Sequence, residues 1–76
     1  MMCQKRAYTT KAGVQQWKPS LRWAKQSGEN GEGFCLACGE VAYGVEPDAR
    51  KYRCENCGAH KVYGGEELAL MGLVFA

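Results

Sequence analysis

The sequence predicts a small, metal-stabilised β domain of antiparallel hairpins, preceded by a basic N-terminal arm in which one short helix is expected. First, four of the five cysteines form two Cys-x-x-Cys-Gly pairs, with fifteen residues between the pairs. Second, a chain of 76 residues buries only about 60% of its unfolded surface, so it needs additional stabilisation, such as a bound metal. Third, residues 1–28 hold six lysines and arginines and no acid, whereas residues 29–76 hold four basic and eight acidic residues.

The paired cysteines predict one structural zinc ion. Two Cys-x-x-Cys turns aim four thiolates at one metal, and a closed shell of four thiolates leaves no position for water or substrate. The predicted ligands are Cys35, Cys38, Cys54 and Cys57. Iron in the same ligand set, a redox dithiol and a secreted disulfide scaffold are the alternatives. The odd number of cysteines and the paired spacing favour the metal over the disulfide scaffold.

Two further residues bear on the metal site. Cys3 lies 32 residues before Cys35 and is expected to be a free thiol, with an intermolecular crosslink as the alternative. His60 follows Cys57 by three residues and is the alternative ligand, but the set of four is already full without it. We therefore expect His60 to be a polar strand residue.

The predicted organisation has three parts: an arm over residues 1–28, a glycine-rich flexible joint over residues 29–33, and a metal domain with an apolar C-terminal tail over residues 34–76. In the arm, Ser20 is expected to cap a helix over residues 21–26 that Gly28 stops. Strands are expected at residues 33–36, 40–45, 50–54 and 59–63, with a turn at residues 46–49. A short helix from Glu66, or a closing strand, is expected in the tail.

The expected core of the sheet follows from apolar residues that recur along these strands. Alternation places residues i and i+2 on one face of a strand. The residues expected to supply most of the apolar contacts are Val41, Tyr43, Val45, Tyr52, Val62 and Tyr63.

Residues 34–70 resemble a zinc ribbon, in which two Cys-x-x-Cys-Gly turns sit at the tips of hairpins. Three stretches, residues 35–40, 44–50 and 54–59, also resemble small zinc-ribbon proteins encoded by bacteriophages, most of which have no assigned function. The resemblance implies a ribbon fold and a small adaptor that acts on host or phage machinery in the host cytoplasm. It does not extend to residues 1–30.

The function expected from the sequence is that of a non-enzymatic, zinc-binding adaptor or regulator. Lysine and arginine neutralise phosphates, and aromatic rings stack on bases, so the first candidate partner is nucleic acid or a complex that processes it. The expected binding residues are Trp17, Lys18, Arg22, Trp23, Lys25, Arg50, Lys51 and Arg53. The alternative is a protein-binding inhibitor of a host defence or transcription machine, without nucleic-acid contact, that uses the apolar tail. Packing of the tryptophans against the ribbon is the alternative to base stacking.

Several classes are not expected. A closed metal shell, a single histidine and the lack of a phosphate loop or a nucleophile–base pair argue against an enzyme and a small-molecule substrate. No apolar run of 18 residues is present, so no membrane span is expected. Reduced thiolates and the lack of a secretory signal favour the cytoplasm.

Overall fold

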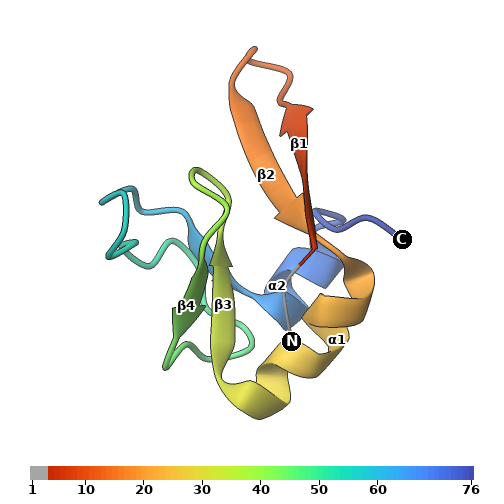
Figure 1. Ribbon diagram of the computed structural model, residues 1–76, viewed down its shortest axis with the longest axis vertical. Coiled ribbons are helices and arrows are strands. Elements are labelled where there is room, and N and C mark those ends of the chain that lie inside the picture. The colour runs from red at the N-terminus through yellow and green to blue at the C-terminus, as the bar shows by residue number, and fades with distance from the viewer. Residues whose placement is uncertain (1–3) are drawn as a thin grey trace.

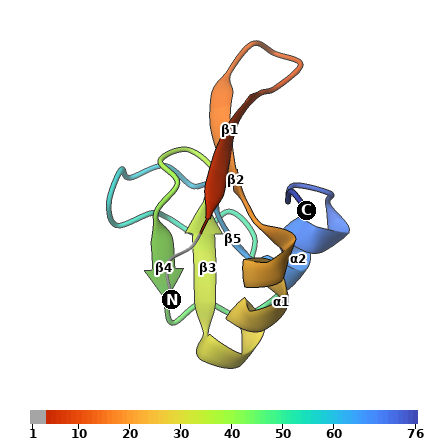
Figure 2. The same ribbon diagram turned by 45° about the vertical axis from the view of Figure 1, so that its right-hand side comes forward.

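The fold is a three-stranded sheet flanked by two helices, from which a two-stranded hairpin projects (Figures 1 and 2). The computed structural model describes residues 4–76. Strand order in the larger sheet is β4-β3-β5, and both pairs are antiparallel. The elements are β1 (Lys5–Thr9), β2 (Gln15–Pro19), α1 (Leu21–Asn30), β3 (Glu32–Cys35), β4 (Val41–Tyr43), β5 (Val62–Gly64) and α2 (Gly65–Leu70). In the part of the chain that the structure describes, neither helix has the length and apolar character that crossing a membrane requires.

The β1–β2 hairpin was not expected from the sequence. Its register pairs Arg6 with Lys18 and Tyr8 with Gln16. The connecting turn closes where the N–H of Gly13 donates to the carbonyl of Thr10 over 2.9 Å. Gly13 has φ 83°, a left-handed conformation that glycine adopts without steric cost. The basic arm therefore contains two strands before its helix.

Helix α1 begins after Ser20, whose hydroxyl accepts a hydrogen bond from the N–H of Trp23 over 3.1 Å. The helix does not stop at Gly28. It continues to Asn30 and ends at Gly31, which has φ 63°. The expected joint over residues 29–33 is thus the last turn of α1 followed by the first residues of β3. The arm and the metal domain are consequently connected by regular structure.

The metal domain has shorter strands than the sequence predicts. Residues 50–54 do not form a strand, and only a bridge between Tyr52 and Val62 remains of it. Gly44, with φ 71°, ends β4 after three residues, so the predicted strand over residues 40–45 is shortened at both ends. Of the two alternatives for the tail, the structure has the helix, α2.

The core consists of two adjacent clusters that β3 connects. Cys35 faces one cluster, together with Val45, Ala49, Cys54 and Val62. Its neighbours in the chain face the second cluster, which comprises Phe34, Leu36, Tyr63 and Leu68, with Trp17, Trp23, Leu73 and Val74 packed against it. Neighbouring strand residues point to opposite faces, so one strand contributes to both clusters.

Two residues of the predicted core are instead exposed. Tyr43 is 77% exposed and Tyr52 is 41% exposed. The alternation that placed Tyr43 inside requires a longer strand than β4, which ends at this residue. The largest fully buried side chains are Phe34 and Leu68, neither of which was in the predicted core.

The C-terminal tail folds back on the protein. The N–H of Phe75 donates to the carbonyl of Pro19, and the N–H of Leu21 donates to the carbonyl of Phe75. The tail therefore runs beside the junction of β2 and α1, with Leu73 and Val74 against the second cluster. Leu70 and Met71, at 79% and 44% exposed, remain on the surface.

Candidate metal centre and basic surface

The two cysteine turns have nearly the same backbone geometry. In the first turn, the carbonyl of Cys35 accepts from the N–H of Gly39 over 2.8 Å. In the second, the carbonyl of Cys54 accepts from the N–H of Gly58 over the same distance. The two glycines have φ of 78° and 80°, a left-handed conformation that glycine adopts without steric cost. Each turn therefore presents its two sulfurs to the same side.

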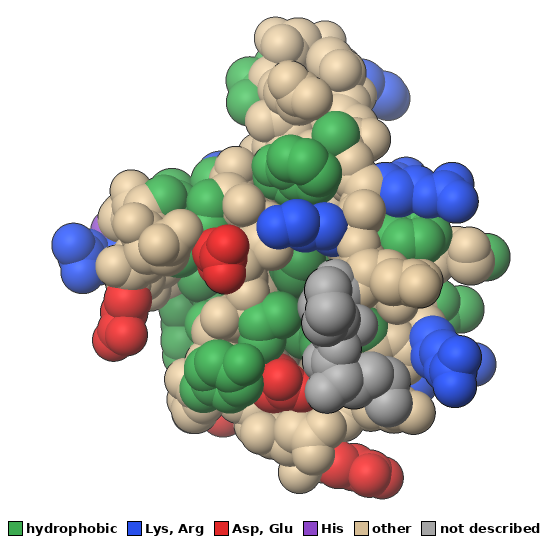
Figure 3. All heavy atoms as spheres, in the orientation of Figure 1, with side chains coloured by type: hydrophobic (Ala, Val, Ile, Leu, Met, Phe, Trp, Pro, Cys, Tyr) green, Lys and Arg blue, Asp and Glu red, His purple; other side chains and the backbone are tan. Residues whose placement is uncertain are grey.

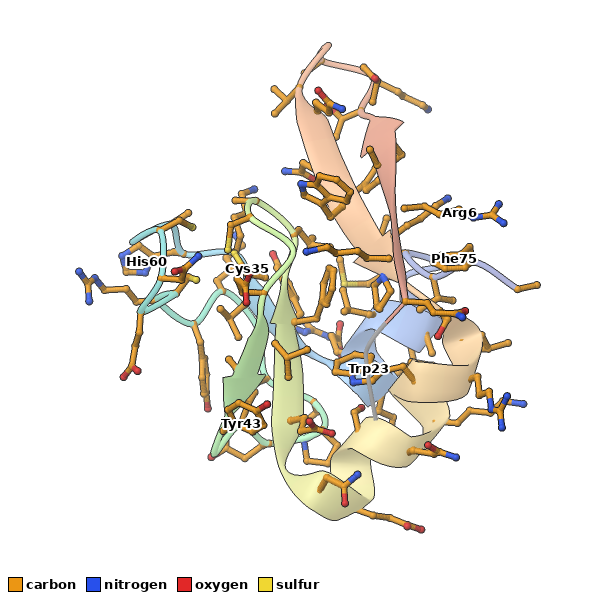
Figure 4. The ribbon with its side chains drawn as sticks, in the orientation of Figure 1. Arg6, Trp23, Cys35, Tyr43, His60 and Phe75 are labelled. Atoms are coloured by element: carbon orange, nitrogen blue, oxygen red, sulfur yellow. The ribbon has the colours of Figure 1, made fainter. Side chains whose placement is uncertain are left out.

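The four sulfurs form a cluster of the size that a tetrahedral metal requires. All four Sγ atoms lie within 4.8 Å of one another. The Cys35 and Cys57 sulfurs are 3.7 Å apart, and the Cys38 and Cys54 sulfurs are 3.6 Å apart. A zinc–sulfur bond of about 2.3 Å places the sulfurs of a regular tetrahedron about 3.8 Å apart. The residues present therefore fit a four-thiolate metal site, and Figure 4 shows Cys35 beside the loop of the second turn.

The surroundings of the sulfurs favour the thiolate form at Cys54 and disfavour it at Cys35, the other buried cysteine. Burial raises the pKa of Cys35 to about 12, although the N–H groups of Cys38 and Ala37 act in the opposite direction. Burial also acts to raise the pKa of Cys54, but hydrogen bonds from the N–H groups of Cys57 and Asn56 outweigh it and lower the pKa to about 7. Backbone N–H groups directed at sulfur stabilise a thiolate. A bound cation would supply the remaining stabilisation of four negative ligands.

The second turn is more open to solvent than the first. The β1–β2 hairpin lies over the first turn: Lys5 Nζ donates to the carbonyl of Gly39 over 3.2 Å, and the N–H of Trp17 donates to the carbonyl of Leu36. In the second turn Cys57 is exposed, and His60 lies exposed in the loop that follows (Figure 4). Among residues 4–76, the group that can hold a metal is the four cysteines, without His60. Cys3 lies outside the described residues.

The predicted binding residues fall into two separate groups. Lys18 lies on β2, and Arg22 and Lys25 lie on exposed parts of α1. Figure 3 shows basic side chains along the side of the molecule that the hairpin and α1 form, while acidic side chains gather over the opposite and lower parts. Arg50, Lys51 and Arg53 lie together in the segment before the second turn. Arg50 is already paired with buried Glu67, at 2.9 Å.

The two tryptophans are placed for packing. Both are half-buried against the cluster that contains Phe34. The rings of Trp23 and Phe34 meet edge to face, with centroids 5.8 Å apart. Lys5 lies over the ring of Trp17, 5.2 Å from its centroid. Their faces are therefore largely occupied by the protein itself.

A shallow hollow lies beside the metal centre. Its volume is about 410 Å³, and it separates β4 from the segment that contains Tyr52 and Cys54. Val41, Val45 and Val62 supply its apolar lining, and Tyr43, whose side chain is exposed, lies on its rim.

Sequence reasoning missed the two strands that place Arg6, Tyr8 and Gln16 on one surface of the hairpin. Their signal is the alternation of polar residues on both sides of a turn that ends at Gly13, but without a run of apolar residues this pattern does not indicate a strand.

Comparisons with known proteins found no relative of this chain. No protein-family model, no curated protein and no solved structure matches the chain. The resemblance to bacteriophage ribbons therefore depends on the two cysteine turns and the residues between them.

Proposed function

We propose that this protein is a non-enzymatic, zinc-stabilised module that binds nucleic acid through the basic side formed by its hairpin and α1. Zinc is the metal that four thiolates in a tetrahedral arrangement favour. When bound, it would act as a structural crosslink between the two turns, held by Cys35, Cys38, Cys54 and Cys57. Four protein ligands complete such a shell, so the centre supplies no position for a substrate.

The observation that carries the nucleic-acid proposal is an excess of positive charge without acidic partners within the protein. Lys18, Arg22 and Lys25 lie on consecutive elements, and no acid occurs before Glu29. Within residues 4–76, none of these three cations takes part in an ion pair. A polyanion supplies the opposite charge and releases counterions when it binds, which favours association at low salt.

Binding to labelled duplex and single-stranded DNA and RNA by fluorescence anisotropy at several salt concentrations tests this proposal. Charge reversal of Lys18, Arg22 and Lys25 together should weaken binding, more strongly at low salt than at high salt. The matched control reverses Lys51, Arg53 and Lys61, which changes the net charge equally at exposed positions away from α1. Absence of salt-sensitive affinity for every probe at ~50 mM salt, where about 6–10 phosphate contacts still bind strongly, would rule out this function.

The second candidate is a protein partner, which the hollow beside the metal centre favours. Tyr43 is exposed on its rim, and exposed aromatic side chains at an apolar recess are typical anchors of protein interfaces. A pull-down with and without nuclease separates the two candidates. A partner that survives nuclease and is lost on Tyr43→Ala, with the metal retained, would support the protein-binding candidate.

A further inference from the structure

We infer that the β1–β2 hairpin is the element that enters the nucleic acid, and that its target is the major groove of duplex DNA. The inference rests on the proposed function and names the surface and the type of nucleic acid. A two-stranded β-ribbon is one of the two protein elements that the major groove of B-form DNA admits. The hairpin projects from the body of the protein, as both ribbon views show (Figures 1 and 2).

The register of the hairpin sorts its side chains onto two faces. Directly paired residues share a face, so Lys5, Ala7 and Trp17 lie on one face. This face packs on the protein, because Lys5 and Trp17 both contact Gly39 in the first cysteine turn: a Cβ on Gly39 would lie 3.0 Å from Lys5 Cδ and 3.1 Å from Trp17 Cγ. The other face bears Arg6, Tyr8, Gln16 and Lys18.

This second face, which we call the Arg6 face, has the chemistry of a DNA-reading surface. Arg6 and Lys18 are paired directly across the two strands. Like charges in directly opposite positions destabilise a strand pair, so the pairing of these two charges adds no stability to the protein alone. A phosphate between them would convert the repulsion into two favourable contacts. Arginine, lysine and glutamine are also side chains that read base edges in the major groove.

Contacts within the protein order these side chains. Lys18 Nζ lies 5.3 Å from the centroid of the Tyr8 ring, and the Arg6 guanidinium lies 4.6 Å from the centroid of Phe75. The hydroxyl of Tyr8 donates to Gln16 Oε1 over 2.9 Å. Cation–π contacts leave the N–H donors of the cations available, because the ring accepts no conventional hydrogen bond from them. Side chains ordered in advance lose less entropy on binding.

The dimensions of the hairpin agree with the same target. Each strand has five residues, about 17 Å at roughly 3.4 Å per residue. A β-ribbon with its side chains is about 10 Å thick, and the major groove of B-form DNA is about 12 Å wide and 8.5 Å deep. The major groove of A-form RNA is too narrow for side chains to read. We therefore expect duplex DNA to bind more tightly than duplex RNA of the same sequence.

The test compares two variants that remove equal charge from the full-length, zinc-loaded protein. Arg6→Gln with Lys18→Gln alters the Arg6 face, and the control, Arg53→Gln with Lys61→Gln, alters exposed positions away from the hairpin and α1. Loss of two phosphate contacts lowers the magnitude of the slope of log K against log salt by about 1.8, which is roughly a 10–100-fold loss of affinity at ~0.1 M salt. We expect this loss for the hairpin variant with a 20-base-pair DNA duplex, and less than about threefold for the control variant. Metal content and circular dichroism verify that both variants are folded.

A second measurement locates the groove independently of the variants. Methylation by dimethyl sulfate modifies guanine N7 in the major groove and adenine N3 in the minor groove. We expect bound protein to protect guanine N7 and to leave adenine N3 reactive. Protection of adenine N3 alone, equal or tighter binding to duplex RNA or single strands, or an equal loss of affinity in the hairpin and control variants would each overturn the inference while nucleic-acid binding stands. If no nucleic acid binds with salt-sensitive affinity, the proposed function fails and the inference fails with it.

Discussion

Removal of the metal should unfold the entire protein, including the hairpin and the helices that hold no ligand. At about 0.05–0.15 kcal/mol per residue, a domain of 76 residues has roughly 4–11 kcal/mol of stability. A structural zinc site contributes about 10–16 kcal/mol at neutral pH, which equals or exceeds this total. The loss therefore exceeds what the hydrophobic clusters can sustain on their own.

Strand β3 should transmit the loss of stability from the metal centre to the rest of the protein. Cys35 belongs to the cluster around the metal centre, while Phe34 and Leu36 on either side of it belong to the cluster that holds Trp17 and Trp23. Displacement of Cys35 shifts its two neighbours as well. The tryptophans supply no ligand to the metal centre, yet their fluorescence should report its state.

Chelator titration with tryptophan fluorescence and far-ultraviolet circular dichroism provides the assay. The two signals should change together in a single transition that added zinc reverses. Above the dissociation constant, each tenfold rise in free zinc should add about 1.4 kcal/mol to the free energy of unfolding. Cys54→Ser should be as damaging as chelation, whereas Cys3→Ser, which removes a thiol outside the described residues, should be nearly silent. Native tryptophan fluorescence and circular dichroism in a metal-free sample would refute the coupling through β3.

Four substitutions test the packing of the two helices and of the end of β5, by thermal and urea unfolding of the zinc-loaded protein. Leu68→Ala should lower the free energy of unfolding by about 2–5 kcal/mol, because this side chain is fully buried. The control Leu70→Ala, at an exposed position of the same helix, should change it by less than about 0.5 kcal/mol. Equal effects of the two substitutions would contradict the described core. Gly28→Ala should stabilise α1 by up to about 1 kcal/mol, because the new Cβ would meet Pro47 Cγ at an ordinary 3.4 Å. Gly64→Ala should destabilise by about 1–3 kcal/mol or more, because its Cβ would lie 2.1 Å from the carbonyl oxygen of Pro47; a neutral result would show that this segment moves apart easily.

The metal site could be predicted from the sequence because the residues that form each turn are neighbours in the chain. Two ligands, their spacing and a following glycine specify each turn, and both turns have the geometry that this pattern indicates. The capping of α1 by Ser20 is equally local, since the hydroxyl and the N–H of Trp23 are three residues apart. The helix nevertheless passes Gly28, because glycine costs only about 1 kcal/mol within a helix.

The hairpin and the core depended on contacts between distant residues. Trp17 bonds to Leu36, and Phe75 bonds to Pro19, so β2 is held by segments that follow it far along the chain. Hydrophobic alternation placed Tyr43 inside because it takes no account of where a strand ends. Leu68 was left out of the core because burial on a six-residue helix depends on which side faces the sheet.

The unequal cover over the two cysteine turns would separate the lifetime of a bound metal from its affinity. Three of the four cysteines are wholly or partly enclosed, whereas Cys57 meets solvent directly. Chelators and oxidants would reach Cys57 first, because thiolate attack and oxidation follow exposure. Four thiolates together would set how tightly a metal is held, whereas the exposure of Cys57 would set how long it stays.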